Sequence, residues 1–159
     1  MSSMLARVFK IVGLSIILMA AVDATTIVVD GVVVNNRINS LGNKMALEMS
    51  KYNCLPDNMV ELYQGEMDDI KAKSLYTKKI TWNKDSAVLA KGENHSPVGE
   101  EYVRDTGEEL TLAIRVDYTW RSLLFSKGAD SETGSFLSSV SSERTRDYTF
   151  NASALRYLK

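Results

Sequence analysis

An uncharged apolar run, Ile11 to Val22, directly follows the basic residues Arg7 and Lys10. A weaker apolar stretch, interrupted by two aspartates, continues to Val34. A segment this apolar avoids contact with water. It does so as a membrane-spanning helix, as a secretory signal, or as part of a buried protein core. This run therefore constrains the fold and the destination of the chain more than any other feature.

Three interpretations of the segment are open. In the first, the basic flank and the apolar run form a secretory signal that is cut after Ala24, so that the mature chain begins at Thr25. In the second, about 20 residues from Phe9 to Val28 cross the membrane, and the basic flank stays in the cytoplasm. In the third, the segment is a buried core helix, which the basic flank and the N-terminal position disfavour.

The residues after the apolar run favour one continuous helix. Charged residues recur at seven-residue intervals, which places them along one stripe of a helix: Asp23, Asp30, Arg37, Lys44 and Lys51. A second face carries apolar residues with the spacing of a helix that packs against others: Ile27, Val34, Ile38, Leu41 and Met45. Because one register spans both regions, the sequence favours an uninterrupted helix from about Phe9 to Tyr52, and retention over cleavage. Such a helix is roughly 65 Å long, about twice the thickness of the hydrocarbon layer.

We expect this helix to assemble with other helices through its apolar face and through Asp23 and Asp30. A carboxylate at membrane depth costs about 2.5 to 3.5 kcal/mol, so such a group usually faces a protein partner. Two alternatives remain for Asp23. Either the helix sits higher and Asp23 lies near the interface, or Asp23 belongs to the cleavage region of a signal.

The remainder predicts a small α+β domain. Leu55 and Pro56 end the first helix, because proline cannot continue the hydrogen-bond ladder. A second helix is predicted from Asn58 to Ser74, packed on the following sheet through one face, formed by Met59, Leu62, Tyr63, Met67 and Ile70.

Strict alternation of apolar and polar residues from Leu110 to Arg121 predicts the central, half-buried strand. Weaker strands are predicted at three further segments: Tyr76 to Asn83, Ser86 to Lys91, and Ser138 to Phe150. Two polar loops are the expected places for partner contact, Gly92 to Gly107 and Lys127 to Ser135. Residues 151–159 are expected to form a short helix or a frayed tail. The predicted α+β fold thus has two parts. Residues 1–52 form a long N-terminal helix with its soluble extension. Residues 53–159 form an extracytoplasmic domain with a second short helix and an antiparallel sheet of three to four strands.

No arrangement of residues predicts catalysis, a cofactor or a metal site. His95 is the only histidine and lacks the neighbours of a nucleophilic triad. The acidic pairs lack the spacing of a calcium-binding loop, and the glycines are scattered as turn glycines are. Cys54 is the only cysteine, which rules out an intramolecular disulfide and predicts a buried thiol. The net charge of -1 gives no reason to expect nucleic acid as a partner.

The order of these parts resembles the pilin class, and most nearly the TadE-like pseudopilins of Tad-type pilus and related secretion systems. The shared features are the basic flank, the apolar helix with an internal acidic residue, its extension to Tyr52, and the small sheet domain. The strand from Val116 to Trp120 and the terminal polar strand ending near Tyr148 are also similar to that family.

The resemblance implies a structural or assembly subunit rather than an enzyme. It implies a single-pass protein with its C-terminal domain outside the cell membrane, or a subunit of an extracellular filament. The partners it implies are membrane lipid and other pilin-like or secretion-system subunits, including copies of this chain. The resemblance does not extend to the processing site: cutting after Gly13 would place Leu18, not an acidic residue, at the fifth mature position. The alternative function is a secreted or surface binding domain with a cleaved signal.

Overall fold

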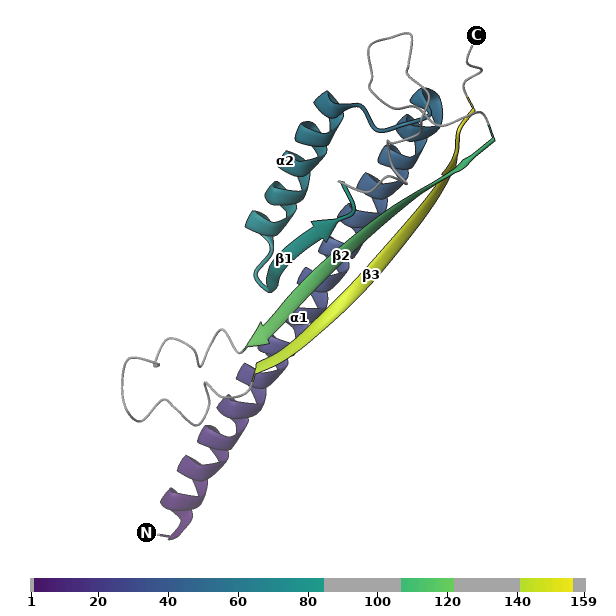
Figure 1. Ribbon diagram of the computed structural model, residues 1–159. Helices are drawn as coiled ribbons and strands as arrows, with labels where there is room; N and C mark the ends of the chain where they lie inside the picture. The colour runs from purple at the N-terminus through teal and green to yellow at the C-terminus, as the bar shows by residue number, and fades with distance from the viewer. Residues whose placement is uncertain (1, 85–106, 122–140, 156–159) are drawn as a thin grey trace.

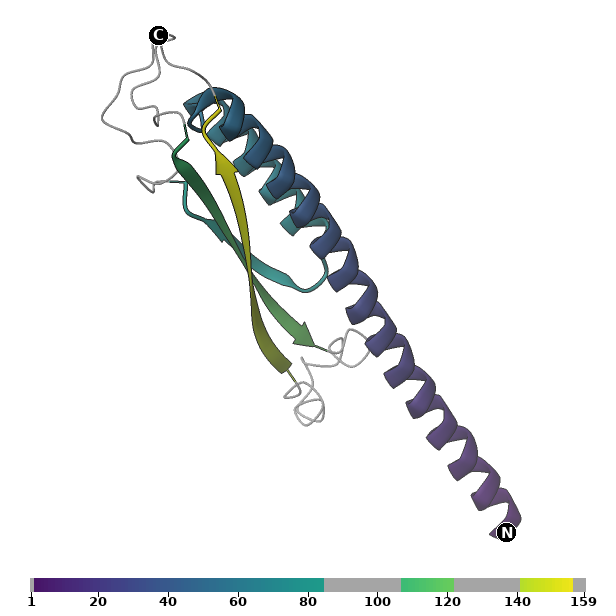
Figure 2. The ribbon, with the colours of Figure 1, turned by 90° about the vertical axis from the view of Figure 1, so that its right-hand side faces the viewer.

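The computed structural model describes residues 2–84, 107–121 and 141–155. Two helices, α1 (Ser2–Tyr52) and α2 (Asp57–Lys73), precede three strands: β1 (Thr77–Trp82), β2 (Glu109–Arg121) and β3 (Ser141–Ser153). Both helices lie on the same face of the sheet, and the N-terminal part of α1 projects beyond it (Figures 1 and 2). The predicted α+β order of a long helix, a short helix and a small antiparallel sheet is confirmed.

Helix α1 is continuous through its apolar and amphipathic halves, as its shared register predicts. It begins at Ser2 rather than near Phe9, because Met4, Leu5 and Ala6 favour the helix and no residue there breaks it. It ends at Tyr52, as predicted, and Asn53 follows with φ of 56°, a left-handed conformation that asparagine tolerates.

The connector between the helices is packed inside the molecule. Asn53, Cys54, Leu55 and Pro56 are all buried, so the expectation of a buried Cys54 thiol is confirmed. Helix α2 begins one residue before its predicted start and ends one residue early at Lys73. Its predicted apolar face is largely correct, except that Leu62 is 55% exposed and lies off the core-facing side.

The sheet has the order β1-β2-β3, with both pairs antiparallel, so β2 is central as predicted. Strand β1 is slightly shorter than predicted and contains a bulge opposite Tyr118. Strand β3 begins at Ser141 and continues to Ser153, so residues 151–153 belong to the sheet and not to a terminal helix or tail. They extend the ladder because their backbone pairs with residues 109–111 of β2. The predicted strand at Ser86 to Lys91 and most of both predicted loops lie outside the described residues.

A single core fills the space between the helices and one face of the sheet. It includes α1 residues from Val34 to Met49, α2 residues Tyr63, Met67 and Ile70, and alternate residues of β2 from Leu110 to Tyr118. The division expected at residue 52 therefore marks the end of a helix, while the C-terminal half of α1 shares its core with the rest of the domain.

Helix α1 lies close to β3 at Gly42. A methyl group added at this position would overlap the ring of Phe150 on β3. Gly42 is buried. A methyl group added at Gly65 on α2, by contrast, would meet open space. The absence of a side chain at Gly42 thus permits the contact between α1 and the sheet. At the end of the domain far from the N-terminus, the backbone N–H of Leu155 donates to the carbonyl of Ser50 at 3.1 Å.

Candidate interaction surface

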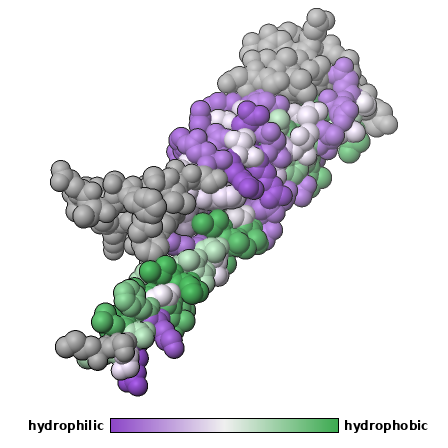
Figure 3. Space-filling model, turned by 90° about the horizontal axis from the view of Figure 1, so that it is seen from below, coloured by the Kyte–Doolittle hydropathy of each residue, from purple (hydrophilic) through white to green (hydrophobic). Residues whose placement is uncertain are grey.

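The N-terminal half of α1 is apolar, and its side chains are exposed. Every large apolar side chain that the structure describes from Met4 to Val22 is at least 42% exposed. By length and composition, α1 is able to cross a membrane. Figure 3 shows the hydrophobic residues gathered on the projecting part of α1, while hydrophilic residues cover much of the domain. This exposure excludes a buried core helix, the third of the three interpretations.

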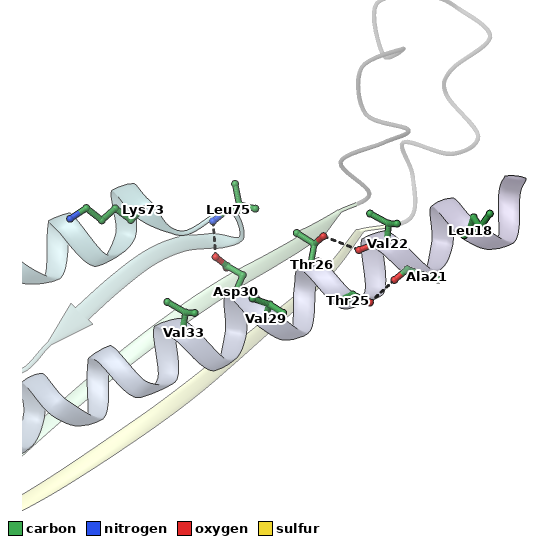
Figure 4. A pocket seen from close by; sticks show the side chains of 10 residues that line it. All are labelled: Leu18, Ala21, Val22, Thr25, Thr26, Val29, Asp30, Val33, Lys73 and Leu75. Atoms are coloured by element: carbon green, nitrogen blue, oxygen red, sulfur yellow. Dashed lines mark hydrogen bonds between the residues drawn. The ribbon is translucent and has the colours of Figure 1, made fainter.

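Hydroxyl groups within the apolar half are satisfied inside the helix itself. The Oγ of Ser15 donates to the carbonyl of Ile11 at 2.9 Å. Thr25 and Thr26 donate in the same way to the carbonyls four residues earlier, each at 2.8 Å (Figure 4). Such back-bonding removes the cost of placing a hydroxyl in an apolar medium. The polar residues of this segment are therefore compatible with a lipid environment.

Asp30 connects α1 to the turn between α2 and β1. Its Oδ2 accepts a hydrogen bond of 2.7 Å from the hydroxyl of Ser74, and its Oδ1 accepts one of 3.1 Å from the backbone N–H of Leu75 (Figure 4). An open apolar groove of about 700 Å³ runs beside Asp30, between α1 and Leu75. The expected assembly candidate Asp30 thus has a bonding role within its own chain.

Asp23 is buried although its neighbours on the helix are exposed. Its exposed fraction is 9%, whereas Val22 is 52% exposed. Burial raises the pKa of Tyr76, and the nearby carboxylates of Asp23 and Asp30 raise it further. The carboxylate of Asp23 therefore lies on the side of α1 that faces the domain, along the same stripe as Asp30.

The charged stripe of α1 continues toward α2. Lys44 forms a 3.3 Å ion pair with Glu66 of α2. Arg37 and Lys44 line a groove between the two helices. This part of the stripe thus runs beside α2, with the side chains of Arg37 and Lys44 exposed at the groove.

Most of the expected assembly face lies in the protein's own core. Val34, Ile38, Leu41 and Met45 are each at most 4% exposed, and Ile27 is half-buried. These four residues pack against the sheet and α2, so they are not available to a neighbouring helix in this fold. The correction has a simple cause: helical spacing shows that residues share a face but not which partner covers it. Four exposed apolar residues of α1 cluster just before its core-facing part, and sequence reasoning missed them: Val28, Val29, Val32 and Val33.

The end of the sheet nearest the N-terminus carries cations stacked on aromatic rings. The guanidinium of Arg144 lies 5.2 Å from the ring centre of Trp120, and that of Arg146 lies 5.3 Å from the ring centre of Tyr148. Trp120 is half-buried and both arginines are exposed. We call Trp120, Arg144 and Arg146 the arginine rim. The alternation of β3 predicts that its arginines share a face with Tyr148, but only the tertiary structure places them at this end of α1.

A hydrogen-bonded tyrosine pair lies directly behind the arginine rim. The hydroxyl of Tyr148 donates to Oδ1 of Asn35 on α1 at 3.1 Å. Burial raises the pKa of Tyr118, and a hydrogen bond to Tyr148 raises it further. This network joins β2, β3 and α1 through polar atoms within the core.

The part of the chain that the structure describes contains no group of three or more histidine, cysteine or acidic residues able to hold a metal ion. Asp68 and Asp69 are exposed on α2, where Gln64 and Lys73 bind them. His95 and the pair Glu100/Glu101 lie outside the described residues. Searches against protein families, curated proteins and solved structures find no match to the chain.

Proposed function

We propose that this protein is a single-pass, pilin-like structural or assembly subunit, held in a membrane by the N-terminal half of α1. The observation that carries the proposal is the division of one helix into two halves. The first is apolar and bare, and the second is part of the core of the domain. No linker separates the anchor from the domain, so the domain has a fixed position on a rigid stalk.

The exposed valines at the base of the domain support an assembly role. Val28 and Val29 lie at the outer end of the segment needed to span a membrane, and Val32 and Val33 extend the apolar surface of α1 beyond it. Exposed apolar surface of this kind is typical of places where another protein or lipid packs. We therefore propose that neighbouring subunits, or copies of this chain, contact α1 at these valines.

The alternative function is a secreted or surface binding domain that loses its first 24 residues as a signal. One observation favours it: the core begins at Val34, so cleavage before Thr25 would leave the core complete. The polar face of the sheet would then be the exposed surface.

The N-terminus of the protein isolated from its native cells separates these functions. We expect a start at Met1 or Ser2, together with resistance to extraction by alkaline carbonate. A start at Thr25 with release into the soluble fraction would overturn the anchor. A start at Leu14, after Gly13, would keep the anchor and add processing of the pilin type.

Assembly is tested by a photo-crosslinking amino acid placed at Val32 in native membranes. We expect protein adducts at this position, and none at Thr149, an exposed position on the opposite face of the sheet. Absence of adducts from all four exposed valines would overturn the assembly role while leaving the anchor intact. In the same assay, Asp23→Ala tests whether the expected assembly residue Asp23 takes part; an unchanged adduct pattern restricts Asp23 to contacts within its own chain.

A further inference from the structure

The described part of the domain ends at about one level of α1 on both of its sides. On one side, Trp120 and Arg144 line a groove of about 380 Å³ together with α1 residues Ile27, Val28 and Gly31. On the other side, the turn at Leu75 binds Asp30. Among the described residues, the edge of the domain nearest the N-terminus therefore lies beside residues 27–31 of α1.

The same level is where a membrane-spanning α1 reaches the outer boundary of the hydrocarbon. A layer about 30 Å thick takes about 20 residues of helix at 1.5 Å per residue. Counted from Lys10, the last basic residue before the apolar run, that length ends at Asp30. The arginine rim thus lies at the depth of the lipid headgroups.

The chemistry of the rim fits this depth. Tryptophan is enriched at membrane interfaces, and arginine binds phosphate through its planar set of donors. The carboxylates close to the rim are engaged elsewhere: Glu143 pairs with Lys78 at 3.2 Å, and Asp147 pairs with Arg115 at 2.8 Å. Among the described residues, neither Arg144 nor Arg146 forms an ion pair, and both guanidinium groups are held over aromatic rings. The rim therefore presents two preoriented cations next to an interfacial indole.

We infer that the arginine rim is a docking site for the headgroups of anionic phospholipids, with Arg144 and Arg146 binding lipid phosphate and Trp120 lying in the interface. The contact fixes the tilt of the domain on the bilayer, because α1 and the end of the sheet then rest on the membrane at two separate places. This inference depends on the proposed anchor and adds a lipid partner for the domain itself.

The two tryptophans supply a matched pair of depth probes. Trp82 pairs with Ile114, six residues before Trp120 on β2, so it lies about 20 Å farther along the sheet from the rim. The full chain is reconstituted into vesicles of phosphatidylcholine and phosphatidylglycerol that contain phosphatidylcholine brominated near the headgroup. In W82F, the fluorescence of Trp120 is expected to be quenched several-fold more than that of Trp82 in W120F. Equal, weak quenching in both variants, with the protein inserted, would overturn the inference.

A second comparison tests the role of charge. R144Q/R146Q is compared with K44Q/K51Q, both in the W82F background; the second pair removes the same charge from the end of α1 far from the membrane. We expect quenching of Trp120 to rise with the fraction of phosphatidylglycerol in the parent and in K44Q/K51Q, and to lose that dependence in R144Q/R146Q. A dependence unchanged in R144Q/R146Q would show that the rim does not bind anionic lipid.

Failure of the anchor and failure of the rim give different results. If the full chain is extracted from the vesicles by carbonate, the anchor is wrong and the inference falls with it. If the chain is inserted but Trp120 is not quenched, the anchor stands and only the docking site is wrong. Circular dichroism of each variant checks that the quenching reports on a folded chain.

Discussion

Asp30 shows how a single carboxylate fixes the relation between α1 and the rest of the domain. It accepts one hydrogen bond from a side chain and one from the backbone, both from residues more than 40 positions away. The Oγ of Ser74 also accepts from the backbone N–H of Thr77 at 3.0 Å, so the same hydroxyl orders the start of β1. Hydrogen bonds to an ionised group are stronger than those between neutral groups. The bonds to Asp30 therefore hold the turn after α2 at one level of α1.

Asp30→Ala is expected to destabilise the protein by about 1–3 kcal/mol, because it removes a charged acceptor and leaves the backbone N–H of Leu75 without its partner, while the hydroxyl of Ser74 keeps Thr77 Oγ1. Denaturant unfolding of the full chain in detergent micelles measures the loss. Asp69→Ala is the matched control: its exposed ion pair with Lys73 contributes about 0–0.5 kcal/mol. Equal losses in the two variants would show that Asp30 does not hold the turn.

Gly42 and Gly65 provide a second test at the same scale. Gly42→Ala is expected to cost about 1–3 kcal/mol, because its methyl group overlaps the ring of Phe150, so that either the ring or the helix must move. Gly65→Ala should instead stabilise by about 0.5–1 kcal/mol, since alanine is the better helix former and has open space there. Thermal unfolding of both variants measures whether the free energy of unfolding falls in Gly42→Ala and rises in Gly65→Ala. A stabilising effect at both positions would contradict the close contact between α1 and β3.

At the scale of elements, the sheet is held to α1 by polar as well as apolar contacts. The core side of β2 is apolar from Leu110 to Val116 and then changes to Tyr118 and Trp120 at the end nearest the N-terminal half of α1. At that end Tyr148 of β3 donates a hydrogen bond to Asn35 of α1, and Tyr148 also raises the pKa of the buried Tyr118 on β2. The helix and the strands therefore have one fixed register along their length, since a shift would leave buried hydroxyls without partners.

This network predicts a fall in stability at alkaline pH. An unfolded tyrosine loses its proton near pH 10, whereas burial and the bond to Tyr148 raise the pKa of Tyr118 in the folded state. Above about pH 10 the unfolded chain binds fewer protons than the folded one, so the free energy of unfolding decreases as pH rises toward the folded pKa. Thermal unfolding between pH 8 and about pH 11 measures this slope, which Tyr118→Phe should make shallower. A slope that Tyr118→Phe leaves unchanged would assign the fall to other groups.

At the scale of the whole molecule, the two halves of α1 have surfaces of different character. Its first half presents apolar side chains outward on all sides, as a helix in lipid does. Its second half turns one face to the sheet and another to α2, as a helix of a soluble domain does. The change occurs near Asp23 and Asp30, where carboxylates first turn toward the domain. The proposed anchor and the domain therefore form one rigid body through this helix.

The division of α1 predicts which truncations are tolerated. A chain that begins at Thr25 keeps every core residue and is expected to unfold cooperatively within about 5 °C of the full chain. A chain that begins at Leu41 loses Val34, Ile38 and the bonds to Asp30. Since each large core side chain contributes about 2–5 kcal/mol, this second chain is expected not to fold. Circular dichroism of the two purified chains, followed on heating, tests both outcomes. Failure of the first chain to fold would show that the apolar half supports the domain directly.

The individual helices and strands follow from interactions between residues that are close together in the sequence. The continuity of α1 follows from helix-forming residues in one register, its end follows from Pro56, and the central position of β2 agrees with its strict alternation. These features depend on backbone sterics and on burial of one face, which neighbouring residues already encode.

Only the tertiary structure decides which surface covers which face. The spacing of Val34, Ile38, Leu41 and Met45 determines that they lie together, but the fold assigns them to the protein's own core instead of to another subunit. The arginine rim likewise joins residues of β2 and β3 that the sequence separates, because strand pairing brings Tyr118 beside Arg144. The sequence by itself determined that the first half of α1 is apolar and helical, whereas its exposure was decided by the fold, in which the described part of the domain leaves it uncovered. The physical reason for the difference is range: periodicity is local, whereas the choice of packing partner depends on all the surfaces that the folded chain brings together.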